Sequence, residues 1–325
     1  MAKLCMTMAN TRDEDIISKE EVALYDRQIR LWGVEAQTRL RKASICVVGV
    51  NTATLEMCKN LVLAGLGGIG LCDPRPIGEC DLETQYYFGT EDVGKRKDVV
   101  LAERLALLNP LVHIEAASID GLQWVDKYDL VVAVGNVDGL PAMREINATC
   151  RDAGKQFIGA DAFGLFGYIF ADCLDAHEYV EEVKGADEGD TSRQVLRASY
   201  KSLDQSCAAS LNITNLKRSL RKYPPLVFIC QALALQGDKR VLGETELSDI
   251  INQSIQGRGI PDGMVDEALI GRVATSWGTE FVPCASVVGG TLAQEVLKVV
   301  TGKDMPVNNW FVYDAIGGDG IQCTI

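Results

Sequence analysis

The chain lacks the closely spaced ligands of a zinc centre. It has 11 cysteines in 325 residues but no C-x-x-C pair, and its only histidines are His113 and His177. Structural zinc sites are built from such pairs, so we expect this chain to bind no metal. A free thiol in an apolar run behaves as a small buried hydrophobic group. Five cysteines lie in runs of this kind: Cys46, Cys58, Cys72, Cys230 and Cys284.

Long apolar runs are also absent. The longest, residues 61–72, contains four glycines and is far shorter than the ~20 residues that cross a bilayer. The N-terminal residues have no apolar core of signal-peptide length. We therefore expect a soluble protein of a reducing, intracellular compartment, present in nucleus and cytoplasm, with no membrane partner.

Positive charge is in deficit. The chain has 32 Lys and Arg against 45 Asp and Glu, a formal net charge of −13. Surfaces that bind nucleic acid need a surplus of basic residues, so we expect no nucleic-acid partner. Composition is otherwise ordinary for a globular protein, at 47% hydrophobic and 24% charged residues. The length fits about two domains, or one large domain with an insertion.

Apolar, β-branched runs alternate with helical patterns over residues 44–161. The strands are expected at residues 44–50, 68–73, 112–118, 129–135 and 155–161, and the helices at residues 52–64, 97–108 and 139–152. This alternation predicts an α/β fold with a doubly wound, mostly parallel, Rossmann-like sheet. Two later runs, residues 167–173 and 309–315, predict added antiparallel strands.

The remaining segments suggest how the chain is divided. We expect a flexible N-terminus over residues 1–19 and one domain over residues 20–325. Residues 178–190 are rich in acidic side chains, which predicts a solvated linker at about 183–192. Residues 210–278 are mixed in charge and predict a helical insertion.

Residues 20–42 predict a helix with one buried face. Its apolar side chains recur every three or four residues, and they are Val22, Tyr25, Ile29, Trp32, Ala36 and Leu40. A glycine in a helix interior costs about 1 kcal/mol. We therefore expect a bend near Trp32–Gly33.

The turn after the first strand lacks most of a phosphate-binding motif. A dinucleotide or ATP site would need G-x-G-x-x-G here, but only Gly49 is present, with Asn51 and Thr54 in place of the other two glycines. A side chain at either position obstructs the close approach of phosphate or of the following helix. Asp73 ends the second strand, where an acidic residue commonly holds a ribose, but Pro74 directly after it favours a turn.

Residues 25–33, YDRQIRLWG, resemble the opening signature of the ubiquitin-activating superfamily, which adenylates the C-terminal glycine of ubiquitin-like proteins. Residues 58–73, 93–110 and 283–314 follow the same plan. Residues 159–182 are most similar to the smaller, regulatory subunits of heterodimeric SUMO-activating enzymes. The resemblance covers about residues 20–182 and 279–325, and it implies a ThiF-type adenylation fold.

Several residues depart from an active half of this superfamily. Arg75 stands in place of a second aspartate, Thr84 in place of an arginine, and Asp81 and Glu83 bring negative charge to a loop that would face a triphosphate. Three vestigial matches remain: Asp73, Lys97 for an ATP-contacting lysine, and Asp138 for a magnesium-binding aspartate. The resemblance implies that this chain binds no cofactor and that ATP and Mg²⁺ are held by a larger catalytic partner subunit.

Arg27 matches the arginine that the inactive half sends across the dimer interface. The resemblance implies that Arg27 stabilises, in trans, the charge that develops at the partner's ATP site. The alternative is that Arg27 pairs with an acidic side chain on its own helix surface. Arg30, three residues further on, is expected to be structural or interfacial.

Three other features are interpreted as structural. Cys207 lies where the active partner has a thioester-forming domain, but it has no neighbouring histidine, so we expect an inert thiol. His177 is expected to be a structural histidine. Gly289 and Gly290 lie in an apolar helix pattern and are expected to serve core or dimer packing rather than phosphate binding.

The leading hypothesis is a regulatory subunit that serves SUMO through the complex. Three alternatives stay open at this stage: a self-sufficient homodimeric adenylating enzyme for a sulfur carrier, a nicotinamide-dependent dehydrogenase, and a non-enzymatic scaffold. The first two need an intact phosphate loop, which this sequence lacks.

Overall fold

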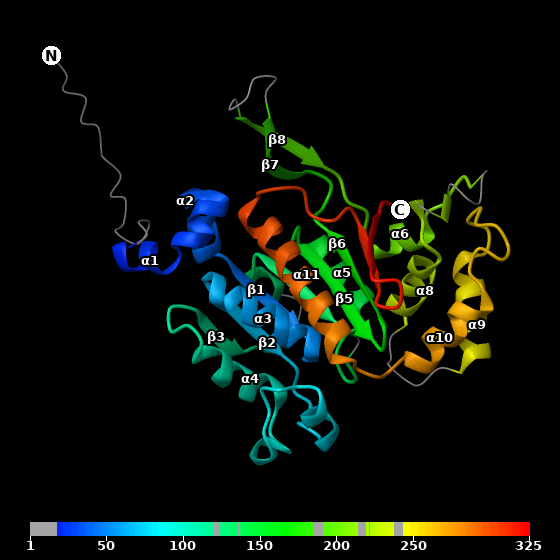
Figure 1. The fold of residues 1–325 in the computed structure, drawn as a ribbon, viewed down its shortest axis with the longest axis horizontal. Helices are drawn as coiled ribbons and strands as arrows, with labels where there is room; N and C mark the ends of the chain where they lie inside the picture. The colour runs from blue at the N-terminus through cyan, green and yellow to red at the C-terminus, as the bar shows by residue number, and fades with distance from the viewer. Residues whose placement is uncertain are drawn as a thin grey trace.

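The computed structural model describes residues 18–119, 124–135, 137–184, 191–213, 219–220, 222–236 and 243–325. Its centre is an eight-stranded sheet in the order β10-β9-β6-β5-β4-β1-β2-β3 (Figure 1). The strands are β1 (Ser44–Val48), β2 (Gly68–Cys72), β3 (His113–Ala116), β4 (Leu130–Val134), β5 (Gln156–Phe163), β6 (Phe166–Asp172), β9 (Trp310–Asp314) and β10 (Asp319–Cys323). The first five are parallel, and β6, β9 and β10 continue the sheet in antiparallel pairing. The expected α/β fold is confirmed.

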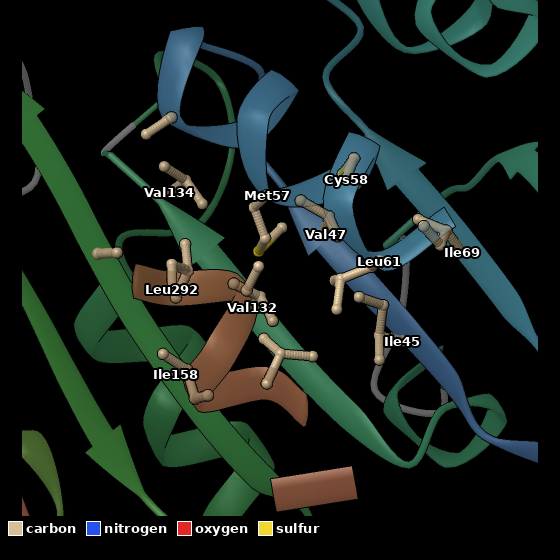
Figure 2. Close-up of a cluster of buried hydrophobic side chains, with 14 of the residues drawn as sticks. Ile45, Val47, Met57, Cys58, Leu61, Ile69, Val132, Val134, Ile158 and Leu292 are labelled. Carbon is tan, nitrogen blue, oxygen red and sulfur yellow. The ribbon is translucent and has the colours of Figure 1, made fainter. Parts of the chain in front are cut away.

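The sheet is covered on both faces because alternate side chains of its strands point to opposite sides. Ile45 and Val47 of β1 face one hydrophobic cluster, whereas Cys46 and Val48 face the other. Figure 2 shows the first cluster, where Met57, Leu61 and Leu292 close over the strands. Such runs, buried on both faces, are typical of parallel strands.

The helices divide between these two clusters. On the first side lie α3 (Thr52–Ala64), α4 (Lys97–Ala106) and α11 (Val282–Thr301), with α3 and α11 packed side by side. On the second side lie α5 (Met143–Asp152), α6 (Leu203–Ala208) and α8 (Pro225–Ala234). Beyond α8 are α9 (Glu244–Ile255) and α10 (Glu267–Ser276), so α8, α9 and α10 all lie within residues 210–278. The expected helix at 139–152 begins only at Met143, because Gly139 has a non-helical φ of 81° and Pro141 disfavours a helical conformation in the residue before it.

The expected N-terminal helix is two helices, α1 (Lys19–Leu24) and α2 (Asp26–Lys42). Gly33 bends α2 with φ 90° and ψ 162°, as its position predicted. Ser18 caps α1, and residues 1–17 of the expected flexible N-terminus lie outside the described residues. The expected buried face is correct for Tyr25, but it is wrong for Val22, which is exposed while Glu21 beside it is buried.

The expected linker at 183–192 is strand at both ends. Strands β7 (His177–Lys184) and β8 (Thr191–Ala198) form a separate antiparallel pair that projects from the main sheet (Figure 1). Opposite charges face each other across this pair, as in the ion pair of Arg197 with Glu178. The acidic residues of β7 therefore lie on a solvated strand, which the sequence pattern could not distinguish from irregular chain. Residues 185–190 lie outside the described residues.

Candidate functional site

The turn between β1 and α3 is the place where a Rossmann-like fold would hold phosphate. Gly49 has φ 93°, and a Cβ there would lie 2.3 Å from the carbonyl oxygen of Val134 on β4. Its N–H donates to the carbonyl of Cys72 at 3.0 Å. The one glycine that remains from the motif is thus required by the close approach of neighbouring strands.

Asn51 and Thr54 stand in place of the other two glycines and form a helix cap. The Asn51 side-chain oxygen accepts the Thr54 backbone N–H at 3.0 Å, and the Thr54 hydroxyl donates to the carbonyl of Gly49 at 2.9 Å. Both side chains are buried. This is an ordinary N-cap, in which a side chain takes a backbone donor that a phosphate would otherwise use.

A second acceptor at this helix end comes from a distant segment. The Glu280 carboxylate accepts the Thr52 backbone N–H at 3.1 Å. The Thr52 hydroxyl also donates to Glu280, and the Thr84 hydroxyl donates to it at 3.3 Å. An anion therefore already occupies the positive end of α3, and it belongs to the chain itself.

Asp73 is fully buried at the end of β2, and its carboxylate is occupied. Arg75 donates to it twice, from Nε at 2.9 Å and from Nη2 at 2.7 Å, and the Val50 N–H donates at 2.8 Å. The hydrogen bond to Asp73 raises the pKa of Arg75, and the charges of Asp73, Asp81 and Asp138 raise it further. Arg75, which stands in place of an aspartate, therefore neutralises a carboxylate at the position where an acidic residue commonly holds a ribose in this fold.

Lys97, at the start of α4, is held by Asp81. Its ammonium lies 2.6 Å from Asp81, and the side chains are only 7% and 13% exposed, respectively. Asp81 also accepts the Gln85 amide at 2.9 Å and the Gly78 N–H at 2.8 Å. Asp138 lies exposed beyond the end of β4. The structure thus brings Asp73, Arg75, Asp81 and Lys97 together, but it pairs them with one another.

The described residues around this turn form no metal-binding cluster. Across the described ranges, no group of three or more His, Cys, Asp or Glu side chains is placed to hold a metal ion. In that same part of the chain, no helix is long and apolar enough to span a membrane. Because Arg75 and Lys97 are both already paired, the residues of this turn do not fit a nucleoside triphosphate with its magnesium.

The segment at residues 25–33 has an inner and an outer side. Tyr25 is buried, with its hydroxyl accepting the Asn109 amide at 2.8 Å, and the Trp32 indole N–H donates to Gln37 at 2.9 Å. Arg27 is exposed, and among the described residues it has no ion-pair or hydrogen-bond partner. Arg30 differs, since it pairs with Asp26 at 3.0 Å.

Exposed apolar side chains continue the outer side around Arg27. Leu24, Leu31 and Val34 are 59%, 72% and 55% exposed. Arg27 and Leu31 are four residues apart in α2 and therefore lie on one side of that helix, whereas Leu24 ends α1 just before it and Val34 follows the bend at Gly33. We call these four residues the outer stripe. Large apolar side chains gathered on an exposed helix side are typical of a protein interface.

Cys207 and His177 are both buried. Cys207 lies in α6, and burial raises the pKa of its thiol to about 12, so the thiol is protonated at neutral pH. His177 begins β7, and its Nδ1 is 2.8 Å from the Gln156 side-chain nitrogen. Its ring stacks on Tyr179 at 6.4 Å between centroids. These surroundings are those of structural groups.

The burial of His177 predicts a pH dependence of stability. Burial lowers the pKa of His177, so below pH ~6.5 the unfolded chain takes up a proton that the folded chain does not. The contribution of neutral His177 to the free energy of unfolding should therefore be fully present above this pH and be lost as pH falls toward the folded-state pKa. Its size is about 1.4 kcal/mol for each pH unit by which the folded-state pKa lies below the unfolded one. Urea unfolding measured between pH 7.5 and 5 should show that the free energy of unfolding falls less steeply with pH in the His177→Gln variant than in the unchanged chain.

The other histidine provides the control. His113 is exposed and lies 3.4 Å from Glu115. A His113→Gln variant should keep the slope of the unchanged chain. If His113→Gln flattens the slope and His177→Gln does not, the assignment is wrong.

Sequence reasoning missed Glu280. It lies 228 residues from Thr52, in a short connection before α11, and no local pattern marks it. Only the packing of α11 against α3 carries its carboxylate to this helix end.

The chain is similar in sequence to known proteins over most of its length. The model of the ThiF family matches residues 25–324. SUMO-activating enzyme subunit 1 of Bos taurus and that of Homo sapiens are each 31% identical to this chain, with 94% of this chain and 95% of either relative covered. SUMO-activating enzyme subunit 1B-1 of Arabidopsis thaliana is 29% identical, over 95% of this chain and 97% of its own length.

Solved structures share the fold at lower identity. The crystal structure of selenomethionine PaaA has a TM-score of 0.58 and 16% identity, covering 98% of this chain and 78% of its own. The structure of E. coli MccB with succinimide has a TM-score of 0.56 and 15% identity, covering 93% and 71%. At such identities the likeness concerns the fold alone.

Proposed function

This chain belongs to the ThiF family, and within it to the family of SUMO-activating enzyme subunit 1, and we propose from this premise that it is the smaller, non-catalytic subunit of a heterodimeric SUMO-activating enzyme. In this proposal the larger subunit holds ATP and Mg²⁺, adenylates the C-terminus of SUMO and then forms the thioester. This chain contributes an interface and one catalytic side chain.

The absence of a free phosphate cradle supports the non-catalytic role. At the start of α3, the Thr54 N–H is taken by Asn51 and the Thr52 N–H by Glu280. Arg75 and Lys97 are bound to Asp73 and Asp81. Binding a triphosphate here would require breaking these pairs and placing its negative charge beside carboxylates, which is unfavourable.

The outer stripe is the observation that carries the proposed role of Arg27. An exposed guanidinium without a partner in the described chain, set among exposed leucine and valine side chains, is suited to enter a neighbouring subunit. In adenylation, the SUMO carboxylate attacks the α-phosphorus of ATP, the new acyl–phosphate bond forms, and pyrophosphate leaves. Arg27 would stabilise the negative charge on the transferring group, as arginine fingers do in phosphoryl transfer.

Exchange of label between pyrophosphate and ATP tests the division of labour. The isolated chain should show no SUMO-dependent exchange, because it has no free phosphate cradle. Addition of the purified larger subunit should produce exchange. Exchange by this chain alone would overturn the proposal and favour the self-sufficient homodimeric alternative.

A further inference from the structure

The Glu280 carboxylate has a position that its own segment fixes from both sides. It lies between α10 and α11, where Trp277 is buried edge-on against Phe163 with ring centroids 5.0 Å apart. The carbonyl of Thr279 accepts the Gly164 N–H at 2.9 Å. A Cβ at Gly164 would lie 2.3 Å from the Ser276 side chain, so the β5–β6 turn is pressed against the end of α10. Glu280 is therefore held in place by the fold.

At this position Glu280 accepts hydrogen bonds from three donors, which belong to two elements beside the turn where a Rossmann-like fold would hold phosphate. Its Oε2 accepts from the N–H and the hydroxyl of Thr52 in the first turn of α3, and from the hydroxyl of Thr84 in the loop after β2. A phosphate at a helix N-terminus uses the same kind of donors, a backbone N–H and nearby hydroxyls. Glu280 is also only partly buried, so its removal would open the position to solvent.

We propose that Glu280 is an internal substitute for phosphate, which closes the start of α3 against phosphate-bearing ligands. This rests on the proposed function, because it explains how the non-catalytic half is kept free of nucleotide. Phosphate is then excluded in two ways: by the side chains that replace glycine at residues 51 and 54, and by the Glu280 carboxylate, which a single substitution can remove. The same contact links the loop of Thr84 to α3 and to the connection before α11, so one carboxylate both occupies the position and holds these segments together.

Inorganic pyrophosphate tests this proposal on the full chain. Glu280→Ala should leave the position empty. We expect this variant to bind pyrophosphate at least tenfold more tightly than the unchanged chain, as measured by isothermal titration calorimetry. Its thermal unfolding midpoint should rise with pyrophosphate at constant ionic strength. Glu280→Gln should show a much smaller gain, because the glutamine amide still fills the space.

Two further variants keep the result interpretable. Glu181 is exposed on β7, so Glu181→Gln changes the net charge equally and should leave pyrophosphate binding unchanged. Glu280→Ser keeps a short acceptor for the Thr52 N–H, and it should gain affinity like Glu280→Ala if the alanine variant folds poorly. A failure of both the alanine and the serine variants to gain affinity, while the unchanged chain binds no ATP, overturns the role of Glu280 but leaves the proposed function intact. ATP binding by the unchanged chain, or pyrophosphate binding by it as tight as that of Glu280→Ala, overturns both.

Discussion

Replacing Arg27 with alanine should slow SUMO adenylation by the assembled heterodimer about 100- to 1,000-fold, the effect typical of removing one donor that stabilises transition-state charge. The loss should appear in the rate of exchange between pyrophosphate and ATP, with little change in ATP affinity. The reason is that Arg27 is proposed to act on charge that develops only as the SUMO carboxylate attacks. Arg27 is exposed and has no hydrogen bond or ion pair in the described part of its own chain, so its removal should leave the fold unchanged.

The neighbouring arginine offers a matched control. Arg30 is also exposed, but it is paired with Asp26 at 3.0 Å. An exposed pair of this kind contributes little to stability, so Arg30→Ala should change the exchange rate by less than about threefold. Arg27→Lys should recover only part of the rate, because a single ammonium cannot present the planar, two-pronged donor of a guanidinium.

Assembly must be measured beside the rate. Size-exclusion chromatography of the purified subunits should show Arg27→Ala entering the heterodimer as fully as the unchanged chain. Leu31→Asp, by contrast, should weaken assembly, because Leu31 is the most exposed apolar side chain of the outer stripe. An Arg27→Ala heterodimer that forms normally and exchanges at the unchanged rate would support a scaffold role instead.

The parallel core was predictable because its signal is local. Each of β1, β2, β4 and β5 is a short apolar run, and each lies within a few residues of its expected range. The bend at Gly33 was predictable for the same reason, since a glycine's backbone freedom does not depend on distant residues. Strand β10 was not expected, because Asp319–Cys323 is short and polar and owes its pairing to β9 beside it.

The sequence showed which phosphate-binding residues are missing from the site, but not which contacts the residues in their place make. The missing glycines and the replaced arginine are visible at Asn51, Thr54 and Thr84. The sequence interpretation treated Asp81 as free negative charge, whereas the structure pairs it with Lys97 at 2.6 Å. Charge counting along a loop cannot reveal such pairing, because it is decided by the packing of the loop on α4.

The close packing of α11 on α3 yields the last prediction, at two adjacent glycines. A Cβ on Gly289 would lie 2.5 Å from the carbonyl oxygen of Ala53 and 2.9 Å from the Cβ of Glu56, whereas a Cβ on Gly290 would meet nothing within 4 Å. Gly289→Ala should therefore force the helices apart and lower the free energy of unfolding by about 1–3 kcal/mol. Gly290→Ala should raise it by up to about 1 kcal/mol, since alanine is the better helix former.

Urea unfolding of the two variants, followed by circular dichroism, measures this difference of about 1–4 kcal/mol between neighbouring residues. Of the two glycines for which the sequence predicts a packing role, Gly289 then makes a core contact with α3, whereas Gly290 lies on an open side of α11. Because Ala53 belongs to the first turn of α3, the clash at Gly289 should also disturb the helix end that holds Glu280. Equal stabilities of the two variants would mean that α11 and α3 lie further apart than their backbones indicate, and the contact between Glu280 and Thr52 would lose its support.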